Sequence, residues 1–212
     1  MKRIIVLLFL FFIFRALAFD ENEDYIKLIS PLSNANKTLI KVFNYECSFC
    51  YKYEKELTPS MVRQTEDILT FRPFHMKRKG KYGKEASELF AVLMVKDMQD
   101  GIDDFMSDKS LFRKAQMAYY NVYYTKKGIK EESANDFLSI GFKVSGISEY
   151  EFNNLKSSPQ VQDILKSWDL QYEVVKFKDA PIYIVNGKYL IKTQTIKSMG
   201  AFVDLVRELA NR

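Results

Sequence analysis

Hydrophobic and polar positions change their spacing several times along this 212-residue chain, and each change predicts a different element. Short β-branched and aromatic runs at residues 25–29, 38–45 and 68–76 are typical of strands. Between the second and third runs, apolar residues recur every four positions, which predicts a helix that begins near Ser48. Pro73 interrupts the third run, and because proline removes a backbone donor we expect either an edge position for this strand or an irregularity at Pro73.

The long middle of the chain, from about residue 84 to 172, has the spacing of helices. Apolar side chains lie three and four positions apart in each segment, and a proline stands at the start of the last one. The predicted helices cover residues 85–98, 111–124, 134–142 and 158–174.

The strand pattern returns at residues 181–191, where two short apolar runs flank Asn186-Gly187, a pair typical of a tight hairpin turn. Residues 196–210 then predict an amphipathic closing helix. The order strand, helix, strand, helical block, hairpin and helix predicts an α/β domain interrupted by an all-helical domain. The predicted parts are the first half of the α/β domain at 19–82, the helical insertion at 83–172 and the second half at 173–212.

Residues 1–18 have the composition of a secretory signal peptide. Lys2 and Arg3 precede an apolar stretch, and residues 16–18 match the A-x-A pattern of a cleavage site. The apolar stretch is too short and wrongly flanked for a transmembrane span. Arg15 close to the cleavage site leaves open an uncleaved membrane anchor.

Net charge gives little support for a nucleic-acid or general membrane-surface partner. Removal of residues 1–18 takes three basic residues and no acidic ones from totals of 32 and 27, so the net charge falls from +5 to about +2. The basic character is therefore largely a property of the signal, and we expect no nucleic-acid partner. The remaining 194 residues suffice for one domain with a real core or for a small domain with an insertion.

Cys47 and Cys50 are the only cysteines, and they stand where a predicted strand gives way to a predicted helix. Three residues is nearly one helical turn, so their sulfurs face one another and a disulfide can close. The sulfur of Cys47 would lie beside unpaired backbone N–H groups and the positive end of the helix dipole, which stabilise a thiolate. This placement predicts Cys47 as the nucleophile and Cys50 as the resolving cysteine of a redox pair.

A zinc site and an inert structural disulfide are the alternatives to a redox pair. Structural zinc needs four ligands, and besides the cysteines the chain offers only one histidine, His75. A disulfide across so short a loop removes little chain entropy. We therefore expect no metal and no cofactor other than the redox-active disulfide. His75 ends a predicted strand and fits a packing residue or a local hydrogen-bond partner better than a catalyst.

Four segments together resemble the DsbA-type thiol oxidases of bacterial cell envelopes. They are CSFCYKYE at the helix start, FRPFHM in the third strand, GKEASELFAV at the start of the helical block and APIYIVNGKY before the closing helix. A C-x-x-C alone is weak evidence, but its combination with the proline segment about 130 residues later is fairly specific. The resemblance implies a thioredoxin-like fold with an inserted helical domain.

The resemblance also implies a role for Ala180 and Pro181. The corresponding proline of the family is cis and lies against the redox pair, which leaves the backbone of residue 180 free to pair with an extended substrate. Its missing N–H also removes a competitor for the thiolate. The family more commonly has valine or threonine before this proline, so Ala180 is a departure that bears on substrate release. A proline that merely starts a strand is the alternative.

Four further residues are expected to tune the site. Ser48 and Phe49 stand between the cysteines where the family commonly has proline and histidine, so the source of thiolate stabilisation differs. Lys41 stands six residues before the first cysteine, where related proteins often have a buried acid that helps proton transfer. A lysine there favours a thiolate, and it carries protons at neutral pH only if burial lowers its pKa. Glu54 matches a charged family position one turn after the second cysteine, with a solvated helix residue as the alternative.

A basic run follows the third strand and has two interpretations. If the second and third strands are parallel, as a strand-helix-strand unit requires, the run leaves the sheet at the edge where the cysteines lie. Its members are Lys77, Arg78, Lys79, Lys81 and Lys84. A solvated loop is the simpler interpretation, and the sharper hypothesis is a preference for acidic substrates or a dedicated partner, as in a DsbL-like branch of the family.

The sequence and its resemblance predict a periplasmic thiol:disulfide oxidoreductase that introduces disulfide bonds into exported proteins. The expected partners are exported cysteine-containing substrates and a DsbB-like membrane quinone reductase, which reoxidises the pair, and the protein itself is expected to be a monomer. Two alternatives stay open. One is a disulfide reductase or isomerase, and the other is a non-redox folding or assembly factor that uses the peptide groove.

Overall fold

A mixed sheet lies at the centre of the structure, a computed structural model that describes residues 19–125, 133–176 and 179–212. The predicted signal peptide at 1–18 lies outside the described residues. The sheet has the strand order β1-β5-β4-β2-β3. Its strands are β1 Tyr25–Lys27, β2 Thr38–Phe43, β3 Thr70–His75, β4 Ile182–Val185 and β5 Tyr189–Ile191.

Strand pairing confirms the predicted strand-helix-strand unit. β2 pairs parallel with β3 and antiparallel with β4, so β2 lies inside the sheet and β3 at its edge. The edge position of β3 agrees with the expectation from Pro73. An edge strand has one side without a neighbouring strand, and on that side the missing N–H of a proline costs no hydrogen bond of the sheet. All six residues of β2 are buried, and five of them are hydrophobic residues or a threonine. The sixth is Lys41, whose charge must therefore be compensated inside the protein.

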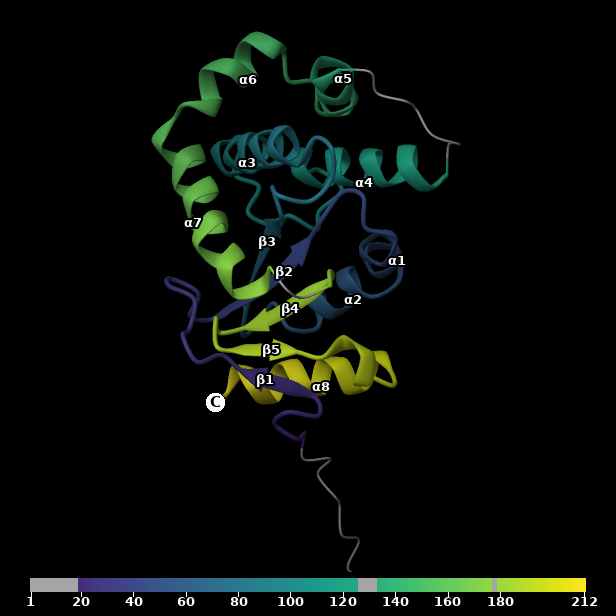
Figure 1. The fold of residues 1–212 in the computed structure, drawn as a ribbon, viewed down its shortest axis with the longest axis vertical. Helices are drawn as coiled ribbons and strands as arrows, with labels where there is room; N and C mark the ends of the chain where they lie inside the picture. Colours follow the sequence, from purple (N-terminus) through teal and green to yellow (C-terminus); the bar gives the residue numbers. More distant parts are fainter. Residues whose placement is uncertain (1–18, 126–132, 177–178) are drawn as a thin grey trace, which may run out of the picture.

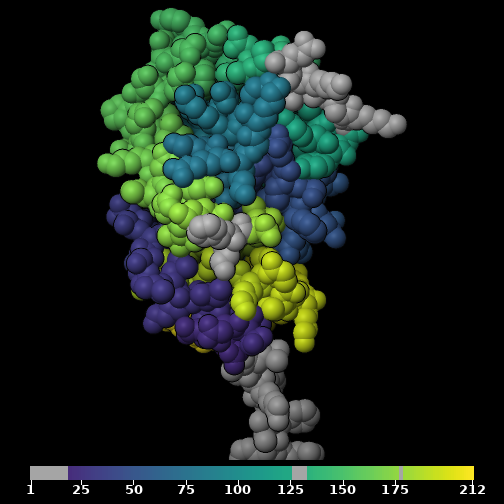
Figure 2. Space-filling view, in the orientation of Figure 1, coloured from purple at the N-terminus to yellow at the C-terminus, as the bar shows by residue number. Residues whose placement is uncertain are grey.

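Helices form two groups around this sheet. One group consists of α1 Ser48–Glu56, α2 Thr58–Arg63 and the closing helix α8 Met199–Ala210. A short 3-10 turn at Thr193–Thr195 precedes α8. The helical block consists of α3 Gly83–Gln99, α4 Leu111–Tyr124, α5 Ala134–Ser145, α6 Glu149–Lys156 and α7 Pro159–Val175. Figure 1 shows this block gathered at the β3 side of the sheet, with α8 at the opposite end. In the space-filling view the teal and green block forms the upper part of the molecule (Figure 2).

Serine caps explain where most of these helices begin. The helices α4 to α8 each have a serine at the N-cap whose side-chain oxygen accepts a hydrogen bond from the backbone N–H three residues later. Such a cap satisfies one of the donors that a helix start leaves unpaired. Among the described helices, none is long and apolar enough to cross a membrane.

The predicted helices are confirmed with two differences. The helix that begins at Ser48 ends at Glu56, and α2 starts anew at Thr58 because Pro59 lacks the N–H that a continuous helix needs at that position. The short helix α6 was not predicted, since only Phe152 of its eight residues is buried and its apolar pattern is weak. The division at 82/83 and 172/173 stays a prediction, and α7 continues past the second of these boundaries to Val175.

The predicted hairpin between β4 and β5 is confirmed. Asn186 and Gly187 have φ angles of 55° and 65°, the left-handed conformation that a tight hairpin turn requires at both positions. A Cβ atom on Gly187 would lie 2.6 Å from the Cβ of Ala35, so glycine is also needed for space. The Asn186 side chain accepts a hydrogen bond from the N–H of Lys37 at 3.0 Å and thereby joins the turn to the start of β2.

Candidate active site

The loop between β2 and α1 presents the two cysteines. The side chain of Asn44 accepts a hydrogen bond from the N–H of Glu46 at 2.8 Å and donates one to the carbonyl of Lys79 at 2.8 Å, which fixes the turn after the strand. Cys47 is the N-cap of α1, with extended backbone angles of φ −97° and ψ 107°. The predicted disulfide to Cys50 is present, with the two Cα atoms 5.1 Å apart.

The surroundings of the two sulfurs differ. Cys47 is half-buried, and its sulfur accepts a hydrogen bond from the backbone N–H of Cys50 at 3.0 Å. Cys50 is fully buried. The same N–H would stabilise negative charge on Cys47 after reduction, together with the positive end of the helix dipole.

Ala180 and Pro181 lie on the other side of the first sulfur. The peptide bond between them is cis. The carbonyl oxygen of Ala180 lies 3.3 Å from the sulfur of Cys47, although the two residues are 133 positions apart in the sequence. Beside this contact is a groove of about 490 Å³. Its lining includes Phe49, Tyr53, Ala180, Pro181, Thr193 and Ile196.

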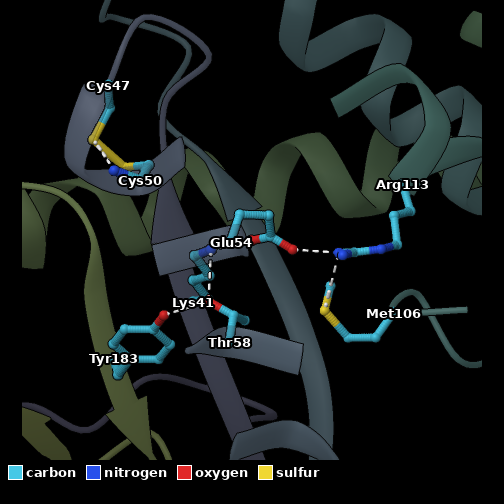
Figure 3. A network of polar contacts seen from close by, with 8 residues as sticks. All are labelled: Lys41, Cys47, Cys50, Glu54, Thr58, Met106, Arg113 and Tyr183. Carbon is cyan, nitrogen blue, oxygen red and sulfur yellow. Dashed lines mark hydrogen bonds and ion pairs between the residues drawn. A yellow bond between two sulfur atoms is a disulfide. The ribbon is translucent and has the colours of Figure 1, made fainter. Parts of the chain in front are cut away.

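A buried chain of polar side chains lies behind the cysteines (Figure 3). Glu54 forms ion pairs through both of its carboxylate oxygens, with Lys41 on β2 and with Arg113 on α4. The ammonium group of Lys41 also donates to the hydroxyl of Thr58 at 3.0 Å. The hydroxyls of Thr58 and Tyr183 share a hydrogen bond of 2.7 Å. The chain therefore joins the redox helix α1, the two central strands, α2 and the helical block.

Burial shifts the acid-base behaviour of this chain. Desolvation lowers the pKa of Lys41 below its usual value of 10.5, the ion pair with Glu54 opposes this effect, and the charge of Arg113 adds to it. Desolvation raises the pKa of Tyr183 well above 10.0, so its hydroxyl stays protonated and available as a hydrogen-bond donor. We expected Lys41 to carry protons at neutral pH only if burial lowers its pKa, and burial does lower it.

The predicted site residues lie either in the buried polar chain or around the sulfur of Cys47 and its groove. Lys41 and Glu54 meet in the buried chain, and since Glu54 has no exposed surface, its interpretation as a solvated helix residue is wrong. Ser48 is exposed, and Phe49 is 66% exposed. The apolar spacing places Phe49 on one face of the helix with later apolar residues, whereas the buried residues of α1 are Cys50 and Glu54.

Arg113 is the functional candidate that the sequence did not indicate. It lies 59 residues after Glu54 on an amphipathic helix, where an arginine is common and does not by itself indicate a functional role. The available signal was Lys41, because a charge inside an otherwise apolar strand requires buried partners. That signal predicts that an opposite charge exists without saying which residue supplies it or whether a second cation joins the pair.

His75 is confirmed as a packing residue. It is fully buried and its Nδ1 atom lies 2.7 Å from the hydroxyl of Ser87. Its ring packs edge-on against Phe43 and Phe90 and stacks on Tyr45, with centroid distances of 5.2, 5.1 and 5.8 Å. Burial lowers its pKa from 6.5 to about 3, so the imidazole is neutral at physiological pH.

The basic run after β3 makes contacts within the protein. Side chains of this run form ion pairs with acidic residues of the helical block. The pairs are Lys77–Asp169, Arg78–Glu173 and Lys84–Glu88. These contacts offset part of the positive charge, and the hypothesis of acidic substrates stays a prediction.

The fold and the cysteine pair define the class of this protein. A disulfide at the first turn of a helix that follows the central parallel strand, with a cis-proline beside its first sulfur, is the arrangement of a thioredoxin-like thiol:disulfide oxidoreductase. The five helices between β3 and β4 form its helical insertion.

Comparisons with known proteins identify the family. The chain is 46% identical over 201 residues to the thiol:disulfide interchange protein DsbL of Escherichia coli O6:H1, a match that covers 94% of this chain and 90% of the relative. A crystal structure of reduced DsbL superposes with a TM-score of 0.87 at 45% identity and covers 92% of this chain and all of the other. A DsbA of Klebsiella pneumoniae shares the fold, with a TM-score of 0.72 at 18% identity. No family model matches the chain. The chain belongs to the DsbA family of thiol:disulfide interchange proteins.

Proposed function

We propose that this protein is a thiol:disulfide oxidase of the periplasm, which introduces disulfide bonds into exported proteins. One observation carries the proposal: the half-buried sulfur of Cys47 lies between the N–H of Cys50 and the carbonyl of Ala180. In this position a sulfur can be approached from solvent and can leave as a stabilised thiolate. The similarity to proteins named thiol:disulfide interchange protein supports the same chemistry.

The reaction begins when a substrate thiolate attacks the sulfur of Cys47. A bond forms between the two sulfurs, the bond between Cys47 and Cys50 breaks, and Cys50 leaves as a thiolate that takes up a proton. A second substrate thiolate then attacks the substrate sulfur of this mixed disulfide and expels Cys47 as a thiolate. Two electrons pass from the substrate dithiol to the protein, and the substrate gains a disulfide.

Substrate binding is proposed at the backbone of Ala180 and the adjacent groove. Ala180 and Pro181 lie next to the redox pair, where the backbone of residue 180 would pair with an extended substrate chain. The exposed ring of Phe49 borders the same groove. An apolar substrate side chain next to the reacting cysteine fits this border.

The remaining partners follow from the direction of electron flow. An oxidase accumulates electrons and must pass them on, and a DsbB-like membrane quinone reductase is the proposed acceptor. In that exchange Cys47 attacks the acceptor's disulfide and Cys50 then expels the acceptor's sulfur, which restores the disulfide. The signal-like residues 1–18 support export, and we propose that the mature protein acts as a monomer.

The direction of the reaction is tested by the equilibrium with glutathione. An oxidase should oxidise a reduced model protein stoichiometrically, and its disulfide should be a much stronger oxidant than that of thioredoxin. A potential near that of thioredoxin would instead identify a reductase. The Cys47→Ser variant serves as the control, since retained activity in vivo after this change would identify a non-redox folding factor.

A further inference from the structure

Glu54 connects the redox helix to the helical block. It lies one turn after Cys50, and both side chains are buried on the same face of α1. One of its carboxylate oxygens pairs with Lys41 from the sheet and the other with Arg113 from α4. In the described part of the helical block, Arg113 is therefore the residue that forms an ion pair with Glu54.

The three charges cannot all be neutralised at once. The side chains of Lys41, Glu54 and Arg113 are only 1%, 0% and 14% exposed, so water does little to screen them. Two cations and one carboxylate leave one net charge in a buried place, which is costly. Arginine side chains keep their proton in proteins, whereas a buried lysine can lose it. Lys41 is therefore the member that can restore balance.

We propose that Arg113 is a positioning residue of the redox site, which holds Glu54 from the helical block and thereby sets whether Lys41 carries a proton. With Arg113 in place, a second cation already pairs the carboxylate, so Lys41 loses its proton at a lower pH. Without Arg113, Lys41 and Glu54 form a simple pair and Lys41 keeps its proton. The proposal concerns the regulation of the proposed oxidase site and rests on that proposed function.

Other ionisable groups near Lys41 do not take over this role. Tyr183 from β4 and Tyr120 from α4 are buried, and burial raises the pKa of both well above 10.0, so both stay neutral where Lys41 titrates. Thr58 contributes only a hydroxyl. Among the described residues, the charged groups that act on Lys41 are therefore Glu54 from α1 and Arg113 from α4.

The redox consequence follows from the position of Lys41. A proton gained or lost there changes the charge behind the helix that carries Cys50, and a positive charge favours thiolate forms of the reduced pair. The equilibrium with glutathione should therefore change its pH dependence at the pH where Lys41 titrates. Removal of Arg113 should move this pH upward.

The test is a titration of Lys41 in the oxidised protein. Its side-chain NMR signal is identified by its loss in Lys41→Met and followed with pH in wild type and in Arg113→Met. We expect the midpoint to rise by about 1–3 units in Arg113→Met, the size of shift that one nearby charge causes on a neighbouring ionisable group. Lys114→Met removes an exposed cation from the neighbouring position of α4 and should change nothing.

The outcomes separate the proposal from the function on which it rests. An equal midpoint in wild type and Arg113→Met overturns the proposal, and because no substrate is present this result does not depend on oxidase activity. The proposal is supported by a higher midpoint together with a higher pH at which the glutathione equilibrium changes its pH dependence. If the role of Arg113 is purely structural, Arg113→Met should lower stability and leave unchanged both the midpoint and the pH at which the glutathione equilibrium changes its pH dependence. If Arg113→Met does not fold, Arg113→Gln retains a hydrogen-bond donor without the charge and decides the question in the same way.

Discussion

Cys47 and Cys50 lie within one turn of the same helix and yet face two different environments. Cys47 is half-buried, with the carbonyl of Ala180 at 3.3 Å and an open groove beside it. Cys50 is fully buried and lies one turn from Glu54, which is paired with two cations. The first side is built mainly from backbone groups and exposed side chains, the second from buried charges.

The difference separates two tasks. The exposed side meets the substrate, so changes there should affect encounter and exchange and leave the fold intact. The buried side holds charges that would be costly if unpaired, so changes there should affect stability and protonation as well as chemistry. Variants on each side test whether this separation holds.

The largest expected effect is loss of exchange on the exposed side. Cys47→Ser should reduce oxidation of a reduced model protein to the uncatalysed background, because Cys50, the other cysteine of the chain, is fully buried. Cys50→Ser keeps the attacking sulfur and removes the resolving one, so a mixed disulfide between Cys47 and glutathione should accumulate and be detected by mass spectrometry. Equal accumulation of mixed disulfides at Cys50 in Cys47→Ser would contradict the asymmetry.

The next largest effect is expected on the buried side. Glu54→Gln removes the only carboxylate of the charge group and leaves Lys41 and Arg113 facing each other. Breaking a buried ion pair typically costs about 3–5 kcal/mol. Urea unfolding of the oxidised protein should show a loss of this size. Glu56→Gln is the matched control, because Glu56 lies on the exposed side of the same helix and should change stability by less than about 0.5 kcal/mol. Similar losses in both variants would remove the distinction.

His75 is another buried ionisable residue, and it predicts a pH dependence of stability. Its pKa is about 3 in the folded protein and 6.5 in the unfolded chain, so between these values the unfolded state binds the extra proton. Stability should therefore fall as the pH is lowered below 6.5, by about 1.4 kcal/mol per unit, or about 2 kcal/mol at pH 5. Unfolding of wild type and His75→Gln across this range measures the contribution as a difference. A constant difference between the two would show that His75 does not remain neutral.

Local backbone features were predicted from the sequence to a greater extent than the buried charge group. The C-x-x-C spacing, the turn at Asn186-Gly187 and the edge position of Pro73 are local patterns, and each reports a backbone geometry that a few residues can specify. The approach of Ala180 to Cys47 spans 133 positions and came from the family resemblance, because no local pattern encodes it.

Charge pairing over long distances was the part that local patterns could not supply. Lys41 in a buried strand demands compensation, but an amphipathic helix tolerates an arginine at many positions, and only the packing of α4 on α1 selects Arg113. For the same reason, the docking of Lys77 and Arg78 on acidic residues of α7 could not be predicted. A basic run shows its charge in the sequence, while its partners are determined by the tertiary fold.

Phe49 should give the smallest effect on stability and the sharpest test of the exposed side. Its ring is 66% exposed and borders the groove beside Pro181, so Phe49→Ala should change the free energy of unfolding by less than about 0.5 kcal/mol. The rate of exchange with a reduced polypeptide should fall, because its side chains lose an apolar contact next to the reacting sulfur. The rate with glutathione should stay near wild type, since so small a thiol does not need the groove. Stopped-flow fluorescence with both reductants measures the two rates, and an equal fall in both would mean that Phe49 acts on Cys47 itself and not on the substrate.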